Sequence, residues 1–202
     1  MKPENEEKKI IAAISHQNRI RHAQARQVIS MEKYSDAMTL VIHEGTLAAY
    51  RTKGKLLMKY FQAPILVGMN ALIDMNENLF FKACGEVKYE IIPRDEVLEI
   101  IERENLWKEA AYVYMFGIKR LVEANNVTAG LSTYESIRQN IFSLMNEKED
   151  LRLTVNACDY IQEKTHLSRS RVMKILSDLR VGGHIEIKRG ILLAVHKLPE
   201  KY

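Results

Sequence analysis

Cationic side chains are concentrated in one short stretch near the carboxyl end of the 202-residue chain. Between positions 169 and 189 there are six Arg or Lys residues against two acids, Asp178 and Glu186. The six are Arg169, Arg171, Lys174, Arg180, Lys188 and Arg189. Their side chains can donate to phosphate oxygens and to the N7 and O6 acceptors of guanine. Because the whole chain has a formal net charge of only +4, this local excess predicts a polyanion bound at one place.

A helix that begins after Ser168 would position most of these cations. Its apolar residues have the i, i+3, i+4, i+7 spacing of one buried helix face. They are Val172, Ile175, Leu176 and Leu179. The opposite face then carries Ser170 and Lys174, and Arg169 lies in the exposed first turn. Ser168 is a suitable N-cap, because its hydroxyl can accept from a free backbone N–H and leave other N–H groups aimed at an anion.

The segments on both sides of this helix predict a winged helix-turn-helix. Residues 155–165 form a shorter candidate helix, and the step His166-Leu167 joins the two helices within a short turn. After Gly182-Gly183, apolar and polar residues alternate over 185–188, and a turn at Arg189-Gly190 predicts a hairpin. The alternative is an amphipathic helix plus hairpin within some α+β core, with the basic residues merely solvated.

The region from Thr39 to Pro93 has short apolar runs separated by Gly and Pro, which predicts a compact β-sandwich or roll. The expected strands are residues 39–42, 46–50, 56–58, 65–67, 79–81 and 87–92. The preceding stretch, from about Ile10 to Met31, is basic and compatible with a helix.

Helices are expected at 95–103, 106–125 and 134–145. In the second of these helices, three small residues recur every seven positions, and two larger ones follow the first two after four positions. They are Ala110, Gly117 and Ala124, with Tyr114 and Leu121. This seam predicts a close dimer contact, and the alternative is that the helix packs on its own β-domain. The expected parts are 1–104, a β-roll with an N-terminal helix, 105–130, a dimerisation helix and hinge, and 131–202, a DNA-binding domain.

Composition narrows the class of protein. With 47% hydrophobic and 28% charged residues, the chain is typical of a soluble globular protein. No apolar run approaches the roughly 18 residues that span a bilayer, and the polar start is unlike a signal peptide, so we expect a cytoplasmic protein. Cys84 and Cys158 are expected to be reduced. The histidine spacing predicts no metal site, and neither a phosphate loop nor a nucleophile motif indicates an enzyme.

The order of these elements resembles the Crp/Fnr family of bacterial transcription regulators. The resemblance rests on residues 167–176, on Gly183-His184-Ile185 and on the β-roll phrase at 41–45. Residues 106–110, 134–138, 160–162 and 197–202 are similar to the enterobacterial IprA-like subgroup, which is associated with stress resistance. The implied fold is α+β: a jelly-roll, cyclic-nucleotide-binding-like β-roll, a long dimerisation helix and a winged helix-turn-helix domain. A homodimer, a double-stranded DNA operator and no cofactor are implied, with RNA polymerase as a further candidate partner.

The resemblance also implies roles on the recognition helix, where the family presents an Arg, a Glu and another cation to bases. The matching positions are Arg169, Ser170 and Lys174. The serine cannot replace a carboxylate that accepts from cytosine, so the operator should differ from the family's best-known half-site. Contacts to the DNA backbone are expected from Ser168, Arg171, Arg180, Lys188 and Arg189.

The effector site departs from the family's cyclic-nucleotide members. Their phosphate is held by a Gly-Glu segment and a later Arg-Ser pair, where this chain has Gly68-Met69 and Glu77-Asn78. Since Met69 cannot accept from ribose and Glu77 would repel phosphate, we expect no cyclic nucleotide to bind. Cysteines for an iron–sulfur cluster are missing before Cys84. The alternative function is a small-molecule or redox sensor in which DNA binding is secondary. Its β-roll cavity would be lined by Leu66, Met69, Leu72, Phe80 and Phe81, and a solidly packed roll would oppose it.

Overall fold

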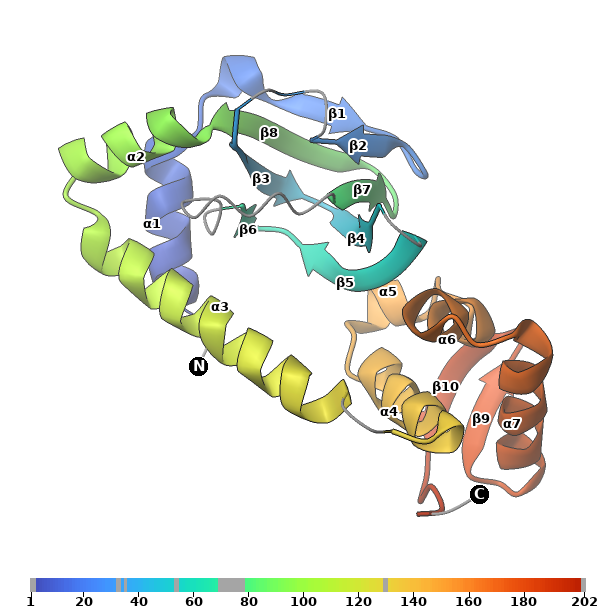
Figure 1. The fold of residues 1–202 in the computed structure, drawn as a ribbon. Helices are drawn as coiled ribbons and strands as arrows, with labels where there is room; N and C mark the ends of the chain where they lie inside the picture. Colours follow the sequence, from blue (N-terminus) through green and yellow to red (C-terminus); the bar gives the residue numbers. More distant parts are fainter. Residues whose placement is uncertain are drawn as a thin grey trace. The chain divides into compact units, whose positions relative to one another are not determined.

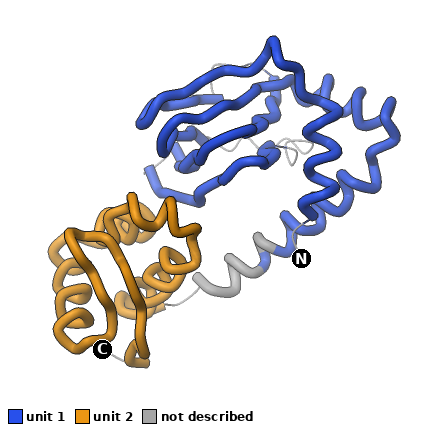
Figure 2. The backbone as a smooth tube through the Cα atoms, turned by 180° about the vertical axis from the view of Figure 1, so that it is seen from behind, with its two compact units in different colours: residues 1–125 blue, residues 126–202 orange. Residues whose placement is uncertain are grey.

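The computed structural model describes residues 3–31, 34, 36–52, 55–68, 79–128 and 131–200, but not the side chains at 120, 121 and 123–128. The chain divides into two compact units, residues 1–125 and 126–202, which are blue and orange in Figure 2. The sequence predicts residues 105–130 as a separate dimerisation helix and hinge, whereas the contacts of the structure group most of these residues with the first unit.

Within the described residues of the first unit, eight strands form two four-stranded antiparallel sheets (Figure 1). The strand orders are β1-β8-β3-β6 and β2-β7-β4-β5. The bounds are β1 (Arg21–Ala23), β2 (Val28–Ser30), β3 (Met38–Glu44), β4 (Thr46–Arg51), β5 (Leu56–Gln62), β6 (Ile65–Val67), β7 (Leu79–Ala83) and β8 (Val87–Pro93). All six strands expected from the sequence fall within β3 to β8, and the predicted β-roll is confirmed.

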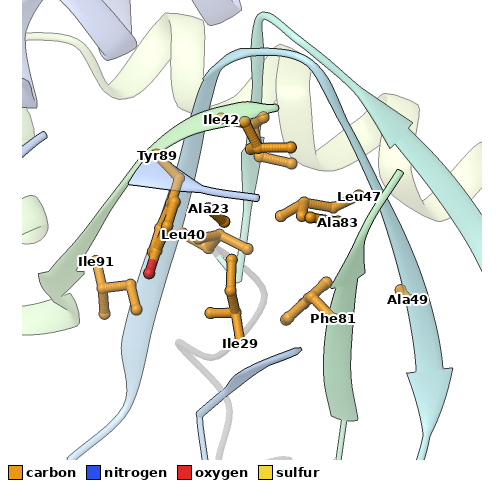
Figure 3. Close-up of a cluster of buried hydrophobic side chains, with 11 residues drawn as sticks. Ala23, Ile29, Leu40, Ile42, Leu47, Ala49, Phe81, Ala83, Tyr89 and Ile91 are labelled. Atoms are coloured by element: carbon orange, nitrogen blue, oxygen red, sulfur yellow. The ribbon is translucent and has the colours of Figure 1, made fainter. Parts of the chain in front are cut away.

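The inner faces of the two sheets enclose one apolar core (Figure 3). Leu40 and Ile42 come from β3, Leu47 from β4 and Phe81 from β7, and at most 3% of each residue is exposed. Alternation along each strand turns every second side chain into this core, as expected for sheets that pack face to face.

Three helices build a second apolar cluster on the other face of β3 and β8. They are α1 (Glu4–Ile14), α2 (Arg94–Arg103) and α3 (Trp107–Thr128). Ile10 and Ile14 are fully buried in this cluster together with Val41 and Ile92. The helix-compatible stretch from Ile10 to Met31 is corrected here, because α1 ends at Ile14 and β1 and β2 follow it. Their pairing with β8 and β7 is long-range, so the local pattern does not reveal it.

A buried carboxylate ties the chain after α1 to the sheet. Glu90 of β8 is 0% exposed, and its Oε1 lies 2.8 Å from His43 Nε2. Its Oε2 accepts from the backbone N–H of His16 at 3.2 Å and lies 3.4 Å from Arg19 Nε. These partners compensate the desolvation of the charge.

The second unit is a small helical domain with a two-stranded sheet (Figure 1). Its elements are α4 (Thr133–Met145), α5 (Glu149–Arg152), α6 (Ala157–Thr165), α7 (Arg169–Val181), β9 (Ile185–Lys188) and β10 (Ile191–Val195). A capping box at Ser132 and Glu135 starts α4, which packs on α6 and β10. Helix α7 packs on α6 and β9. The five helices and the hairpin predicted after residue 94 all have the expected secondary structure.

Candidate nucleic-acid interface

A tight turn joins α6 to α7. The Asn156 side chain caps α6 by accepting from the N–H groups of Cys158 and Asp159. The helix ends at Thr165, and the φ of 56° at its C-cap, His166, is left-handed and reverses the chain. Ser168 then occupies the N-cap position of α7. The predicted helix-turn-helix is confirmed at this place.

The two faces of α7 differ as the sequence spacing predicts. Its inward side chains are at most 5% exposed, namely Val172, Ile175, Leu176 and Leu179. The outward face holds Arg169, Ser170, Met173 and Lys174, which are all exposed. This face therefore offers cations, a hydroxyl and one apolar side chain to a ligand without disturbing the core.

The Ser168 side chain differs from the expectation. It makes no capping hydrogen bond to the start of α7, and its Oγ lies 3.3 Å from Ser170 Oγ. Both serines are exposed, and the capping role is corrected to a pair of neighbouring hydroxyls at the first turn of α7.

Arg169 leans back onto α6. Its Nη1 lies 2.5 Å from Asp159 Oδ1 and 3.2 Å from Gln162 Oε1. The hydrogen bond with Asp159 raises the pKa of Arg169 above an ordinary value that already leaves the guanidinium cationic. Sequence spacing could not reveal this pair, because it depends on how α6 and α7 pack against each other.

The wing is docked on the start of α6. Strands β9 and β10 pair in antiparallel fashion, and Arg189 and Gly190 form the turn with φ values of 51° and 85°. The Gly190 carbonyl accepts from the Ala157 N–H at 2.8 Å, and a Cβ on Gly190 would lie 2.2 Å from Asn156 Nδ2. The predicted hairpin is confirmed, and it fixes the exposed Arg189 beside the first turn of α6.

Arg180 and Lys188 border one open hollow of about 500 Å³ between the end of α7 and the wing. Eleven residues separate Arg180 from Arg169, which is about 16 Å along a helix axis. Arg169, Arg171 and Lys174 therefore lie on the first two turns of α7, and Arg180 lies at its far end, where it borders the hollow with Lys188. Arg189 lies apart from Arg180, at the wing turn beside the start of α6.

Met173 is a candidate base-contacting residue that the sequence analysis missed. Its side chain is 48% exposed, on the same face as Arg169 and Lys174. Its exposed thioether suits the methyl group of thymine, and the one hint in the sequence is that this methionine falls outside the apolar spacing of α7.

The first residues of the predicted dimer seam pack within their own unit. Ala110 is 1% exposed and buried in the cluster with α1 and α2, and Tyr114 packs partly against it. Burial raises the pKa of Tyr114 to about 12. Gly117 is open to solvent, while the side chains of Leu121 and Ala124 lie outside the described residues. The alternative, that this helix packs on its own β-domain, holds for the first half of α3.

A different apolar stripe of α3 remains uncovered. It consists of Trp107, Ala111, Met115, Ile118 and Val122, which are spaced by four, four, three and four residues and are all exposed. We call it the α3 stripe. Met115, Ile118 and Val122 are 56%, 59% and 54% exposed, a large apolar area for the surface of one helix.

The predicted effector cavity is not assembled by its described residues. Leu66 is buried in the cluster with α1, Phe81 lies between the sheets, and Phe80 stacks on Tyr50 at 5.2 Å. These three side chains therefore have different surroundings. Phe80 and Phe81 are neighbours on β7 and face opposite sides of its sheet. Met69 and Leu72 lie outside the described residues, as do Glu77 and Asn78.

Both cysteines are free thiols, with Cys84 exposed and Cys158 buried. Burial raises the pKa of the Cys158 thiol, which disfavours the reactive thiolate. Among the described residues, no group of three or more His, Cys, Asp or Glu side chains could hold a metal ion. None of the described helices is long and apolar enough to cross a membrane.

Comparisons with known proteins agree with this geometry. Residues 133–200 match the sequence family described as "Winged helix-turn-helix DNA binding". The chain is 32% identical over 181 residues to "Inhibitor of hydrogen peroxide resistance" of Escherichia coli strain K12, which covers 88% of this chain and 86% of that protein. The Salmonella typhimurium protein of the same description is 28% identical over 189 residues, covering 93% and 90%.

Solved structures share the fold at low sequence identity. The c-di-GMP-responsive global regulator CLP of Xanthomonas campestris superposes with a TM-score of 0.72 at 14% identity, covering 94% of this chain and 98% of that one. A CooA mutant from Carboxydothermus hydrogenoformans has a TM-score of 0.67 at 14% identity, covering 89% and 84%.

Proposed function

Because the chain belongs to the family of bacterial proteins described as "Inhibitor of hydrogen peroxide resistance", with a winged helix-turn-helix and the Crp/Fnr fold, we propose that it is a homodimeric, sequence-specific transcription regulator. The observation that carries the proposal is the exposed polar face of α7 over a fully buried apolar face. A helix of this kind can enter the major groove, while the wing supplies phosphate contacts.

The base contacts of the proposal are Arg169, Ser170 and Lys174, on the first two turns of α7. Arg and Lys suit guanine, and a serine hydroxyl can pair with any base edge that offers a donor or acceptor. The phosphate contacts are Ser168, Arg171, Arg180, Lys188 and Arg189. Contact with RNA polymerase stays a prediction from the sequence.

Selection from a random pool tests the proposal directly. We expect the purified full-length protein to enrich duplexes with two related half-sites whose centres are about one helical turn apart. A Lys174→Ala protein should enrich a different or weaker motif. Recovery of no common motif by the natural protein would contradict sequence-specific binding.

We further propose that the regulated genes influence survival of hydrogen peroxide, on the ground of the relatives' description. Deletion of the gene should raise survival after a peroxide challenge, and the natural protein should restore sensitivity. The Lys174→Ala variant, made at the same level, should not restore it. Equal survival of all strains would separate this protein from the property in its relatives' name.

The β-roll is proposed to bind no cyclic nucleotide, because the ribose position holds Met69 and the phosphate position holds Glu77 in place of suitable partners. Titration calorimetry with cyclic AMP should show no heat of binding. Micromolar binding, accompanied by tighter DNA binding, would overturn this part of the proposal.

A further inference from the structure

A carboxylate lies on the surface that the proposed function assigns to DNA. Asp159 is in the first turn of α6, whose start carries the docked wing through the Ala157 to Gly190 hydrogen bond. Its side chain is 52% exposed and pairs with Arg169, whose side chain is 59% exposed. A negative charge here opposes any phosphate that approaches, so affinity for DNA alone does not explain it.

We propose that Asp159 is a positioning residue that sets the preference of α7 for specific over non-specific DNA, acting through Arg169. This inference rests on the proposed function and names a determinant of its selectivity. Gln162 assists as the second acceptor for the same guanidinium nitrogen, at 3.2 Å.

The geometry supports an orienting role. Arginine discriminates guanine through two parallel N–H bonds from one edge of its planar fork. Asp159 and Gln162 both accept from Nη1, so they fix the plane of the fork and leave other N–H groups of the guanidinium available. An arginine held in this way loses less rotamer freedom when it meets guanine than a free one does.

The negative charge of Asp159 supports a second role, in which it weakens the binding of Arg169 to non-specific DNA. Without a guanine in reach, the most favourable partner of Arg169 outside the protein is a phosphate. Pairing with Asp159 satisfies the guanidinium internally and places a repulsive carboxylate beside the same phosphates. Non-specific binding is therefore weakened, whereas the specific complex keeps the Asp159–Arg169 pair and adds the guanine contact.

The variant Asp159→Asn tests this role, with Glu163→Gln as its control because it removes the same charge from the same helix four residues later. Fluorescence anisotropy on the selected duplex and on a scrambled duplex, at several salt concentrations, measures both affinities. For Asp159→Asn we expect tighter non-specific binding, and a specific-to-non-specific ratio that falls about tenfold, the lower range of what an arginine–guanine contact discriminates. For binding of this variant to scrambled DNA, the slope of log K against log salt should steepen by about one unit, because the released guanidinium neutralises one more phosphate.

A double-variant cycle tests whether Asp159 acts through Arg169. In an Arg169→Ala background, Asp159→Asn should leave the ratio unchanged, because there is no guanidinium to position. An equal fall of the ratio in that background, or an equal fall with Glu163→Gln, would overturn the inference. An unchanged ratio for Asp159→Asn alone would also overturn it while leaving the proposed function intact. If the natural protein selects no sequence, the proposed function fails and this inference fails with it.

Discussion

Single side chains on the second unit divide into those that can read bases and those that can only hold phosphates. Lys174 is exposed in the second turn of α7, and Lys188 ends strand β9 at the wing. The proposed function therefore assigns sequence selectivity to Lys174 and sequence-independent affinity to Lys188.

Replacing either lysine by alanine should separate the two roles. Lys174→Ala should cost about 1–3 kcal/mol on the specific duplex and relax the preference at one base pair per half-site. Lys188→Ala should weaken binding to the specific and the scrambled duplex alike, and it should flatten the slope of log K against log salt by roughly one unit. Anisotropy titrations at several salt concentrations measure both effects. A changed ratio of the two affinities for Lys188→Ala, with none for Lys174→Ala, would reverse the assignment.

At this scale the sequence predicted residue types better than contacts. The spacing of Val172 to Leu179 was sufficient to tell the buried face of α7 from the exposed one, because a single helix has a fixed period. The pairing of Arg169 with Asp159 could not be predicted, since it joins two helices across a turn. Met173 was not predicted as a contact, because an apolar side chain on a polar face does not by itself indicate a ligand.

The elements of the first unit depend on contacts between distant segments, and the Glu90 cluster is the sharpest case. Glu90→Gln removes one of the two carboxylates that pair with Arg19, the other being Glu96, and turns an acceptor at Oε1 or Oε2 into a donor. We expect a loss of about 1.5–3 kcal/mol in unfolding free energy, the usual contribution of hydrogen bonds to a buried charge. Urea unfolding followed by the fluorescence of Trp107 measures it, because the chain has one tryptophan and it lies in this unit.

Glu44→Gln provides the matched control for the Glu90 variant. Glu44 is on β3 and pairs with Lys88 at 2.9 Å, but its side chain is 64% exposed. Solvent screening should limit the loss there to less than about 1 kcal/mol. Equal losses for the two variants would mean that burial of Glu90 adds nothing to the strength of its contacts.

Elements with a clear local period were predicted well, and those defined by pairing were not. The apolar runs of β3 to β8 are bounded by Gly and Pro, so their existence could be inferred from the sequence. By contrast, β1 and β2 have three residues each, and their pairing with β8 and β7 cannot be inferred from so short a pattern. The predicted effector cavity included both Phe80 and Phe81, but neighbouring residues of β7 face opposite sides of their sheet and cannot line one cavity.

At the scale of the whole molecule, the described side chains of α3 form two apolar faces, and only one of these two is covered by its own unit. The periodicity of small residues selected the face with Ala110, which α1 and α2 already bury. Sequence alone could not decide between the faces, since both have a spacing compatible with a helix seam. The uncovered α3 stripe is the better candidate for the partner of a homodimer, because its residues are exposed whereas Ala110 is buried within its own unit.

Adjacent residues of α3 allow the two seams to be compared directly. Ile118 belongs to the α3 stripe, and Gly117 belongs to the seam predicted from the sequence and lies about 100° away around the helix. Ile118→Glu should give monomers in light scattering, because a carboxylate would be buried against the partner without compensation. Operator binding should weaken as well, since a monomer holds only one half-site. Gly117→Glu should remain dimeric, as a Cβ at that position meets no atom within 4 Å in its own unit. The reverse pattern, with monomers from Gly117→Glu and a dimer from Ile118→Glu, would return the contact to the face that the sequence first indicated.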